Sequence, residues 1–302
     1  MHCIFCHKES SNSKSIEHII PESLGNKHYF LPQGYVCDQC NNYFAVKIEK
    51  ELLAQPYFVS LRSRCEISTK KGKDVKQKAI FPDLSTNAEV VIKTTENGLI
   101  IHIDENEVEL YENIKAKGIK QICIPYIYEP EYPNIIMSRF LAKCAYEYFL
   151  YQFSEENYNK CAQELLSKEN DLLKRLREYA RYGKGEFWHY HQQRIYSEGY
   201  LVYNTKKNII EERLFEMMFF IKNHEEQADD IVDAEIYFIV DIFGIEYAIC
   251  LSDPQINEYK EWRRLNVHSP LEDSAHSPLE DNIRIKFPSD LSDLNPLLIK
   301  KQ

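Results

Sequence analysis

Apolar and polar residues alternate along residues 87–105, NAEVVIKTTENGLIIHIDE, and an Asn-Gly pair interrupts the alternation near its middle. Alternation with a period of two is typical of a strand buried on one face, and Asn-Gly favours a tight turn between antiparallel strands. This segment therefore predicts a β-hairpin. Residues 120–130, KQICIPYIYEP, have the composition of a further strand that is closed by prolines.

Two stretches in the middle of the chain have the periodicity of helices. Residues 137–153, MSRFLAKCAYEYFLYQF, place apolar side chains at helical spacing. Residues 154–183 follow, with Ser154 as the expected N-cap and Gly183 as the expected stop. The two stretches together predict a helical hairpin.

The last third of the chain changes to long apolar runs that are typical of strands. These are residues 212–224, 234–242 and 245–253, and the last two are joined across Phe243-Gly244. We expect them to form an antiparallel sheet. Residues 268–281, HSPLEDSAHSPLED, are a tandem repeat whose Ser-Pro and acidic content predicts a solvated loop, so its two histidines are not assigned to a metal.

The first 55 residues are rich in Cys, His and Asn and are expected to form a compact unit. Within it, residues 15–20 predict a short strand that stops at a proline. Apolar residues then recur at the spacing of a helix, at Cys40, Phe44, Ile48 and Leu52. Residues 56–84 are basic and polar and predict a linker or extended arm. Residues 85–302 are expected to form a mixed body, so the fold class is α+β.

Composition indicates a globular protein, because 44% of the 302 residues are hydrophobic and 28% are charged. No run approaches the roughly 18 apolar residues that a membrane span needs. The first residues, MHCIFCHKES, lack the apolar core of a secretory signal, so a cytoplasmic location is expected. The nine cysteines are then expected to be metal ligands or buried thiols rather than a disulfide framework.

The net charge of −10 is unevenly distributed along the chain. Residues 1–78 carry 12 basic and 8 acidic residues, whereas the remainder carries 25 basic and 39 acidic residues. Attraction of a polyanion depends on local charge, so a basic N-terminal part on an acidic body is compatible with nucleic-acid binding.

Four cysteines form two pairs, Cys3-x-x-Cys6 and Cys37-x-x-Cys40, with 30 residues between the pairs. Two intervening residues allow both sulfurs of a pair to reach one metal ion, and four thiolates are a common ligand set for structural Zn²⁺. Buried thiols without a metal would not predict paired spacing. A unit of about 50 residues with few large apolar side chains also needs such a cross-link to hold its shape.

Residues between and after the cysteine pairs add polar groups suited to a second ion. If one zinc ion gathers both pairs, the strand that carries Glu17 and His18 lies against the start of the helix that carries Asn41. The oxygens of Glu17 and Asn41 can then bind a hard cation. His18, on the opposite face of the strand, is available as a base. Asn41 is also a good helix N-cap, and the two roles can coexist.

The motifs "EHIIP" and "CDQCN", residues 17–21 and 37–41, resemble those of the HNH (ββα-metal, His-Me finger) endonucleases that carry two zinc knuckles. The further stretch "PESLGN…GYVCDQCNNYF" is similar to a bacterial branch of that family. The resemblance covers residues 1 to about 55 and implies a zinc-stapled ββα-metal domain. It does not extend to the C-terminal third.

The resemblance implies a role for each matching residue. His18 would be the general base that deprotonates water, and Glu17 and Asn41 would bind one Mg²⁺ or Mn²⁺ ion at the scissile phosphate. Hydrolysis would leave a 5′ phosphate and a 3′ hydroxyl. Two positions depart from the family pattern. Pro32 stands where the family's middle Asn is usual, with Asn26 as the candidate substitute, and Glu17 stands where Asp is commoner.

Basic residues beyond the motif are candidates for contact with phosphate groups. They are Arg62, Arg64, Lys70, Lys71 and Lys73, although a run of charges is also typical of a soluble loop. Arg139 and Lys143 lie one helical turn apart and can extend the same binding face. His189 and His191 have the spacing of strand-borne metal ligands, but a structural role is favoured because no third ligand is apparent.

Two functions from different classes follow. The first is a metal-dependent endonuclease that cuts DNA, with RNA not excluded as a substrate. Such domains are often joined to other bodies in bacterial restriction and antiphage defence. The second is a non-catalytic zinc module, derived from an HNH domain, that binds nucleic acid or protein. Residues 85–302 have no chemical assignment from the sequence, and the alternatives for them are reading DNA shape, sensing a ligand, forming a homodimer or binding a partner protein.

Overall fold

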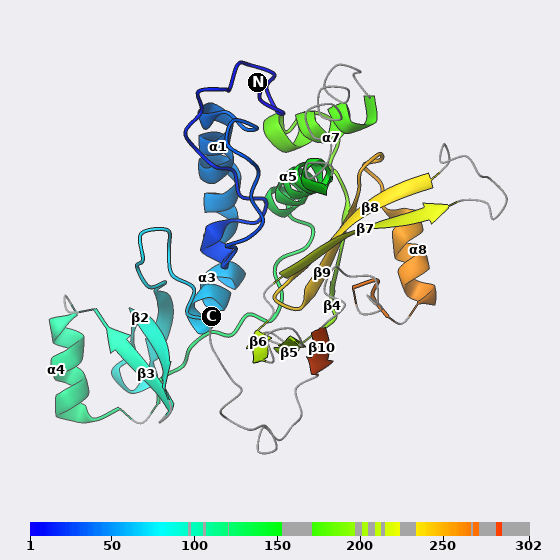
Figure 1. Cartoon of the computed structure of the whole chain (residues 1–302). Helices are drawn as coiled ribbons and strands as arrows, with labels where there is room; N and C mark the ends of the chain where they lie inside the picture. The colour runs from blue at the N-terminus through cyan, green and yellow to red at the C-terminus, as the bar shows by residue number, and fades with distance from the viewer. Residues whose placement is uncertain are drawn as a thin grey trace. The chain divides into compact units, whose positions relative to one another are not determined.

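The computed structural model describes residues 1–285 except for 96–97, 105–106, 120, 153–170, 197–200, 205–208, 213–214, 224–233, 267 and 272–281. Contacts divide the chain into two compact units. One comprises Met1–Ile19, Leu31–Asn41 and Pro133–Gln302, and the other comprises Ile20–Phe30 and Asn42–Tyr132. The mixed α+β class is confirmed (Figure 1). The sequence boundaries at residues 55 and 84 stay a prediction.

Short helices are the regular elements in the first 64 residues. They are the 3₁₀ helix η1 (Glu22–Leu24), α1 (Asp38–Phe44), the π-helical turn η2 (Ala45–Glu49), α2 (Lys50–Leu53) and α3 (Pro56–Arg64). The predicted helix after the second cysteine pair is confirmed, although it begins at Asp38 rather than at Asn41. Phe44, Ile48 and Leu52 are all fully buried, as their spacing predicted.

The strand predicted at residues 15–20 is wrong, since no strand element is assigned there. His18 forms an isolated β-bridge, but most carbonyls that have a partner in this segment bind side chains rather than a neighbouring strand. The carbonyl of Glu17 accepts from the amide of Leu31, and the carbonyl of Ile20 accepts from the side chain of Asn26. Side chains of Asn41, Lys143 and Cys144 bind the carbonyls of Ile16, His18 and Ile19.

The second unit contains a three-stranded antiparallel sheet and helix α4 (Val108–Lys117). The strands are β1 (Gln77–Phe81), β2 (Thr86–Thr95) and β3 (Gly98–Ile103), in the order β1-β2-β3, and the short helix η3 (Pro82–Leu84) joins the first two. Ile92 faces Ile101 across the predicted hairpin, which is confirmed. The core between this sheet and helix α4 contains Ala79, Phe81, Val90 and Leu110.

Two segments of this unit differ from the sequence-based expectation. Residues 56–84 contain α3 and β1, and Tyr57, Phe58 and Leu61 of α3 are buried. Residues 120–130 were predicted to be a strand. The described part pairs only through the isolated bridge between Cys123 and Ile80, which is consistent with the prolines in this stretch.

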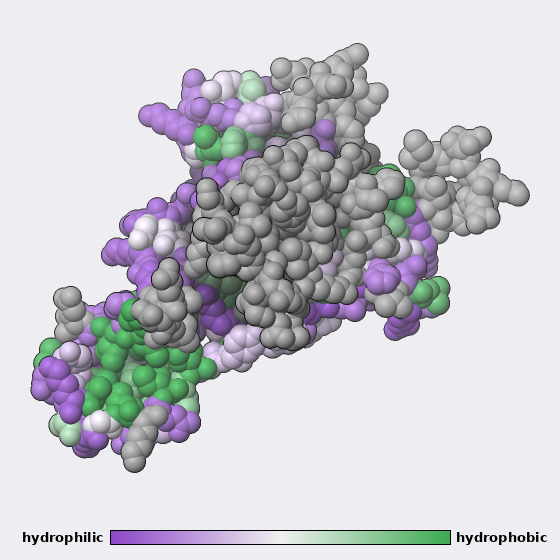
Figure 2. Space-filling model, turned by 60° about the horizontal axis from the view of Figure 1, so that its bottom comes forward, coloured by the Kyte–Doolittle hydropathy of each residue, from purple (hydrophilic) through white to green (hydrophobic). Residues whose placement is uncertain are grey.

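Apolar side chains gather on the surface over β1–β3 and α4, as Figure 2 shows at its lower left. Exposed members are Ile80, Ile100, Val108 and Tyr111, each at least 46% exposed. Ile101, Ile103 and Ile114 are partly buried beside the core of this sheet. A single layer of helix therefore covers the small sheet incompletely.

Helices α5 (Ile135–Gln152) and α7 (Asp171–Tyr182) pack against each other in the first unit. The predicted helix from residue 137 is confirmed, and α7 ends as predicted at Gly183, whose positive φ of 65° favours glycine. The expected cap at Ser154 lies outside the described residues. Met137, Phe140, Leu141 and Tyr148 are among the buried residues of α5.

The C-terminal strands form two antiparallel sheets. The larger has the order β4-β9-β8-β7, with β4 (Tyr190–Arg194), β9 (Ile245–Cys250), β8 (Ala234–Ile242) and β7 (Phe215–Asn223). The smaller joins β10 (Asn282–Ile285), β5 (Leu201–Asn204) and β6 (Ile209–Glu212), and helix α8 (Asn257–Leu265) packs on the larger sheet. The predicted antiparallel pairing of residues 234–242 with 245–250 is confirmed.

The turn between β8 and β9 consists of Phe243 and Gly244, which both have positive φ values, 52° and 80°. Two successive positive φ values are the geometry of a type I′ hairpin turn. The tandem repeat lies outside the described residues from 272 onward. None of the described helices has the length and apolar character to cross a membrane.

Candidate nuclease centre

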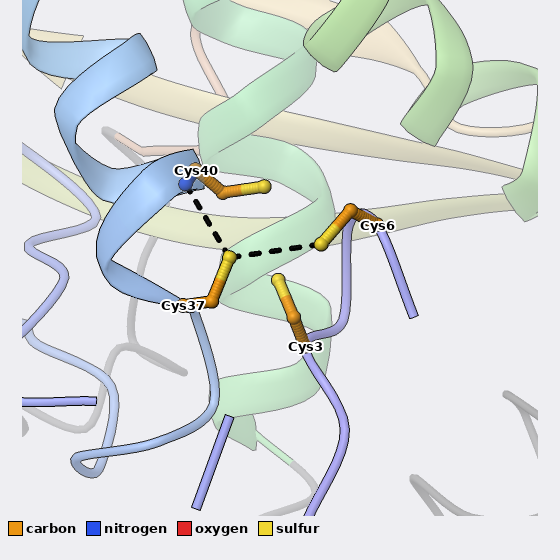
Figure 3. Close-up of side chains that lie close together, drawn as sticks. All are labelled: Cys3, Cys6, Cys37 and Cys40. Carbon is orange, nitrogen blue, oxygen red and sulfur yellow. Dashed lines mark hydrogen bonds between the residues drawn. The ribbon is translucent and has the colours of Figure 1, made fainter. Parts of the chain in front are cut away.

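The sulfurs of Cys3, Cys6, Cys37 and Cys40 lie within 4.8 Å of one another and point toward a common centre (Figure 3). The Cys6 and Cys37 sulfurs are 3.6 Å apart. Four thiolates around Zn²⁺ with bonds of about 2.3 Å place the sulfurs roughly 3.8 Å apart. The residues therefore fit a tetrahedral zinc ion, and the predicted cluster is confirmed.

Local backbone geometry brings each pair of cysteines together. In the first pair, the amide of His7 donates to the carbonyl of Cys3, and His7 has a positive φ of 60° that turns the chain. In the second pair, the amide of Cys40 donates to the Cys37 sulfur at 3.4 Å, within the first turn of α1. Each pair thus presents two sulfurs from one turn of backbone.

A hydrogen bond favours the thiolate form of Cys3. The bond from the Cys40 thiol is the largest influence on Cys3, whose pKa is lowered to about 4 although burial opposes this. The Arg181 Nε donates to the Cys40 sulfur at 3.2 Å, and Arg181 is buried on α7. A guanidinium beside the cluster offsets part of the negative charge that four thiolates bring to Zn²⁺.

Helices α5 and α7 also hold the backbone of the first cysteine pair. The hydroxyl of Tyr146 donates to the carbonyl of Ile4 at 3.1 Å. Arg177 Nη1 donates to the carbonyl of Phe5 at 3.1 Å and also contacts the His7 ring. The residues between the two cysteines are therefore fixed by side chains that lie more than 140 positions later in the sequence.

Glu17 is buried, with 4% of its surface exposed, and its carboxylate binds the ammonium of Lys143 at 2.8 Å. Lys143 is 0% exposed and lies on α5, so the expectation that it extends a phosphate-binding face is wrong. The α5 helix is surrounded by protein at this level, and helical spacing alone does not distinguish a buried lysine from an exposed one. His18, the next residue along the chain, is half-buried.

Asn41 lies in α1, three residues after its first residue Asp38, so it is not the N-cap of this helix. Its side-chain Nδ2 donates to the carbonyl of Ile16 at 3.1 Å. This bond places Asn41 beside the backbone that leads into Glu17 and His18. The structure thus brings the second cysteine pair and the Glu17-His18 segment together.

Asp38 is a site residue that sequence reasoning missed. Its carboxylate accepts hydrogen bonds from the Ser15 hydroxyl and amide and from the Lys14 amide, at 2.7, 2.8 and 2.9 Å. The bonds from Ser15 lower the Asp38 pKa. Asp38 therefore anchors the two residues that precede Ile16. An acidic residue in the first turn of a helix was the available signal.

Asn26 is fully buried and makes four hydrogen bonds with its side chain. Its Nδ2 donates to the carbonyls of Ile20 and Tyr29, and its Oδ1 accepts from the amides of His28 and Tyr29. All four distances lie between 2.6 and 3.0 Å. Asn26 therefore closes the loop that follows His18. A loop-fixing role of this kind is what the resemblance implies for the family's middle Asn, for which Asn26 is the candidate substitute.

The candidate phosphate contacts differ in their exposure. Arg62 is buried, and burial lowers its pKa. The Arg64 guanidinium lies over the Tyr126 ring at 4.3 Å and donates to Ser60. Lys70, Lys71 and Lys73 are exposed in the loop between α3 and β1. These three lysines are the accessible members of the basic cluster.

Residues 3–56 match a family model described as HNH endonuclease. The N-terminal segment is an HNH domain. No curated protein and no solved structure matched the chain. The HNH domain accounts for the cysteine cluster and for the segment from Glu17 to Asn41. Within the part of the chain that the structure describes, the four cysteines are the one group of His, Cys, Asp and Glu side chains close enough to share an ion.

Proposed function

We propose that the chain is a divalent-metal-dependent endonuclease that hydrolyses phosphodiester bonds of DNA. The observation that carries the proposal is the hydrogen bond from Asn41 to the carbonyl of Ile16, inside a matched HNH domain. This bond brings the second cysteine pair to the segment of Glu17 and His18. An HNH domain implies a nucleic-acid substrate, and the choice of DNA over RNA is part of the proposal.

In this proposal His18 acts as the general base. A neutral imidazole is poised near physiological pH and takes the proton of the attacking water. Oxygens of Glu17 and Asn41 would hold Mg²⁺ or Mn²⁺, which would supply Lewis-acid stabilisation at the phosphate and at the leaving 3′ oxygen. Glu17 shares its carboxylate with the Lys143 ammonium, so the ion binds beside an existing cation. The expected products carry a 5′ phosphate and a 3′ hydroxyl.

Substrate contacts are proposed for the exposed loop between α3 and β1. Lys70, Lys71 and Lys73 are accessible there, whereas Arg62 and Arg64 would contribute only if their present contacts changed. Within residues 85–302, helices α5 and α7 contact the cysteine pairs and the Glu17-His18 segment. We propose that residues 85–302 bind a partner protein or a second copy, and that the protein acts in the cytoplasm in bacterial defence or restriction.

A second function has a specific observation in its favour. The Lys143 ammonium already compensates the Glu17 carboxylate, which is the arrangement expected if the HNH domain keeps its shape but no longer binds a catalytic ion. The protein would then be a zinc module that binds nucleic acid or protein without cleaving it.

Incubation of the zinc-loaded protein with supercoiled plasmid DNA in Mg²⁺, Mn²⁺ or Ni²⁺ distinguishes the two. The nuclease proposal predicts nicked plasmid with at least one of these ions and none in the presence of a chelator that spares the zinc. Binding in a mobility-shift assay without any nicking would support the non-catalytic module. The same gel also tests whether the chain acts as a dimer, because a dimer that makes two nicks produces linear DNA.

A further inference from the structure

Lys143 has more contacts with the HNH segment than a simple ion pair requires. Its ammonium binds Glu17 Oε1 at 2.8 Å and donates to the backbone carbonyls of His18 and Ile19, at 2.8 and 3.4 Å. On its own helix it binds Glu147 Oε2 at 3.2 Å, one turn further on. Three of these contacts are with the segment Glu17, His18 and Ile19, which contains the proposed base.

The burial of this group makes a purely stabilising role a poor explanation. The side chains of Lys143 and Glu147 are 0% exposed, and that of Glu17 is 3% exposed. Removing an ion from water costs several kcal/mol, and well-packed apolar residues often do as well or better in such places. Packing alone does not require two carboxylates and one ammonium to be grouped in the protein interior.

The directions of the hydrogen bonds indicate what the ammonium does. It binds a carboxylate oxygen of Glu17 and the carbonyls of the two following residues, so it fixes the Glu17 side chain and the backbone that follows the His18 Cα. The neighbouring Cys144 thiol also donates to the Ile19 carbonyl, at 3.1 Å. Side chains of helix α5 thus bind the carbonyls of His18 and Ile19, which a neighbouring strand would bind in a β-ladder.

We propose that Lys143 is a positioning residue of the nuclease centre, which holds Glu17 and the His18 backbone in their working geometry from helix α5. This inference rests on the proposed nuclease function. It assigns part of the centre to residues outside the HNH domain.

The test uses a charge-matched double variant, Lys143→Met with Glu147→Gln, in the full chain. This variant removes one positive and one negative charge, so the buried group keeps its net charge and Glu17 stays intact. Lys143→Met alone leaves two buried carboxylates without the ammonium and is expected to lower the melting temperature. The double variant is expected to recover most of that loss and to retain one zinc per chain.

Nicking and metal binding then separate positioning from simple charge balance. We expect the double variant to nick plasmid about 100-fold more slowly, because misplacement of reacting groups by about 1 Å can cost that much. The Mn²⁺ affinity is measured by calorimetry on two zinc-loaded proteins, His18→Ala and His18→Ala combined with the double variant. We expect the combined variant to bind Mn²⁺ at least as tightly as His18→Ala. A rate loss without an affinity loss is the signature of positioning.

Several results would overturn the inference. If the folded double variant nicks at the wild-type rate, Lys143 only balances charge. If the double variant loses both nicking and Mn²⁺ binding, the substitutions have damaged the site as a whole. Lys143→Arg keeps the charge and changes the bond directions; we expect it to fold and nick slowly, and wild-type nicking would contradict positioning. Lys117→Met, which removes an exposed lysine of α4, is the control. A wild-type protein that does not nick at all is a failure of the proposed function instead.

Discussion

The side chain of Asn26 accounts for the shape of the loop after His18, because all four of its hydrogen bonds are made within residues 20–29. Replacement by Ala would leave buried backbone amides and carbonyls without this partner. We expect Asn26→Ala to lower the free energy of unfolding by about 2–4 kcal/mol. Urea denaturation measures this change.

The control for this prediction is Asn42→Ala, which truncates an exposed asparagine on α1 and is expected to change stability by about 0.5 kcal/mol or less. Equal effects of the two substitutions would show that the Asn26 bonds do not hold the loop.

Residues whose partners are near in sequence were predictable, and those with distant partners were not. The four cysteines were recognisable because each pair lies within one turn of backbone. The cluster forms when these two turns lie side by side. Glu17 was recognisable from its motif, but its partner Lys143 lies on another helix of the body. The sequence spacing of Arg139 and Lys143 favoured a shared exposed face, whereas α5 buries Lys143 completely.

At the scale of elements, helix α7 contributes to the zinc site through Arg181. Loss of the Nε bond to the Cys40 sulfur removes a partner that favours the thiolate. We expect Arg181→Met to weaken zinc binding roughly 10- to 100-fold, which is typical when such supporting contacts are removed. Competition with a colorimetric zinc chelator measures the affinity.

Arg264→Met, which removes an exposed arginine on α8, should leave zinc affinity unchanged. If Arg181→Met also leaves it unchanged, α7 supports the backbone of the first cysteine pair but not the metal.

Helix α8 and the larger sheet are joined by a buried polar group around Glu246 of β9. Its Oε1 binds Tyr259 and Arg263 of α8 at 2.9 and 3.1 Å and His191 of β4 at 3.3 Å. Burial opposes ionisation of Glu246, but the hydrogen bonds from His191 and Ser269 and the charge of Arg263 outweigh it and lower its pKa. This contact agrees with a structural role for His191.

A lowered pKa makes the contribution of Glu246 to stability depend on pH. The contribution is complete above the ordinary glutamate pKa of the unfolded chain and is lost as the pH falls through the lowered pKa of the folded protein. We therefore expect Glu246→Gln to be destabilising near pH 7, with a difference from wild type that shrinks as the pH falls below the ordinary glutamate pKa. Urea unfolding of both proteins across this range measures the difference, and a difference independent of pH would contradict the assignment.

Elements with a clear period were predicted well, and those fixed by contacts with distant residues were not. The hairpin of residues 87–105 and helices α5 and α7 followed from alternation, helical spacing and a terminal glycine. The segment of residues 15–20 has the composition of a strand, but its carbonyls bind Asn41, Lys143 and Cys144. Residues 56–84 were predicted to be a linker because they are rich in basic and polar residues, although α3 buries apolar side chains.

At the scale of the whole molecule, the four-cysteine cluster joins segments that are 30 residues apart and are also bound by α5 and α7. Removal of zinc should therefore loosen contacts well beyond the HNH domain. We expect a strong zinc chelator to lower the melting temperature by several degrees or more and to reduce the near-ultraviolet circular dichroism of the buried tyrosines. Re-addition of one equivalent of Zn²⁺ should reverse both changes. Retention of both signals after verified zinc loss would show that the body folds without the cluster.

The most direct test of the account measures plasmid nicking by wild type, His18→Ala and His28→Ala, each with its zinc content determined on the same preparation. His28 is an exposed histidine in the following loop, and only its backbone amide takes part in the Asn26 bonds, so it is a matched control. The account predicts one zinc per chain in all three, unchanged nicking by His28→Ala, and a loss of about 100-fold or more in His18→Ala, as expected for a missing general base. Undiminished nicking by zinc-loaded His18→Ala would contradict it.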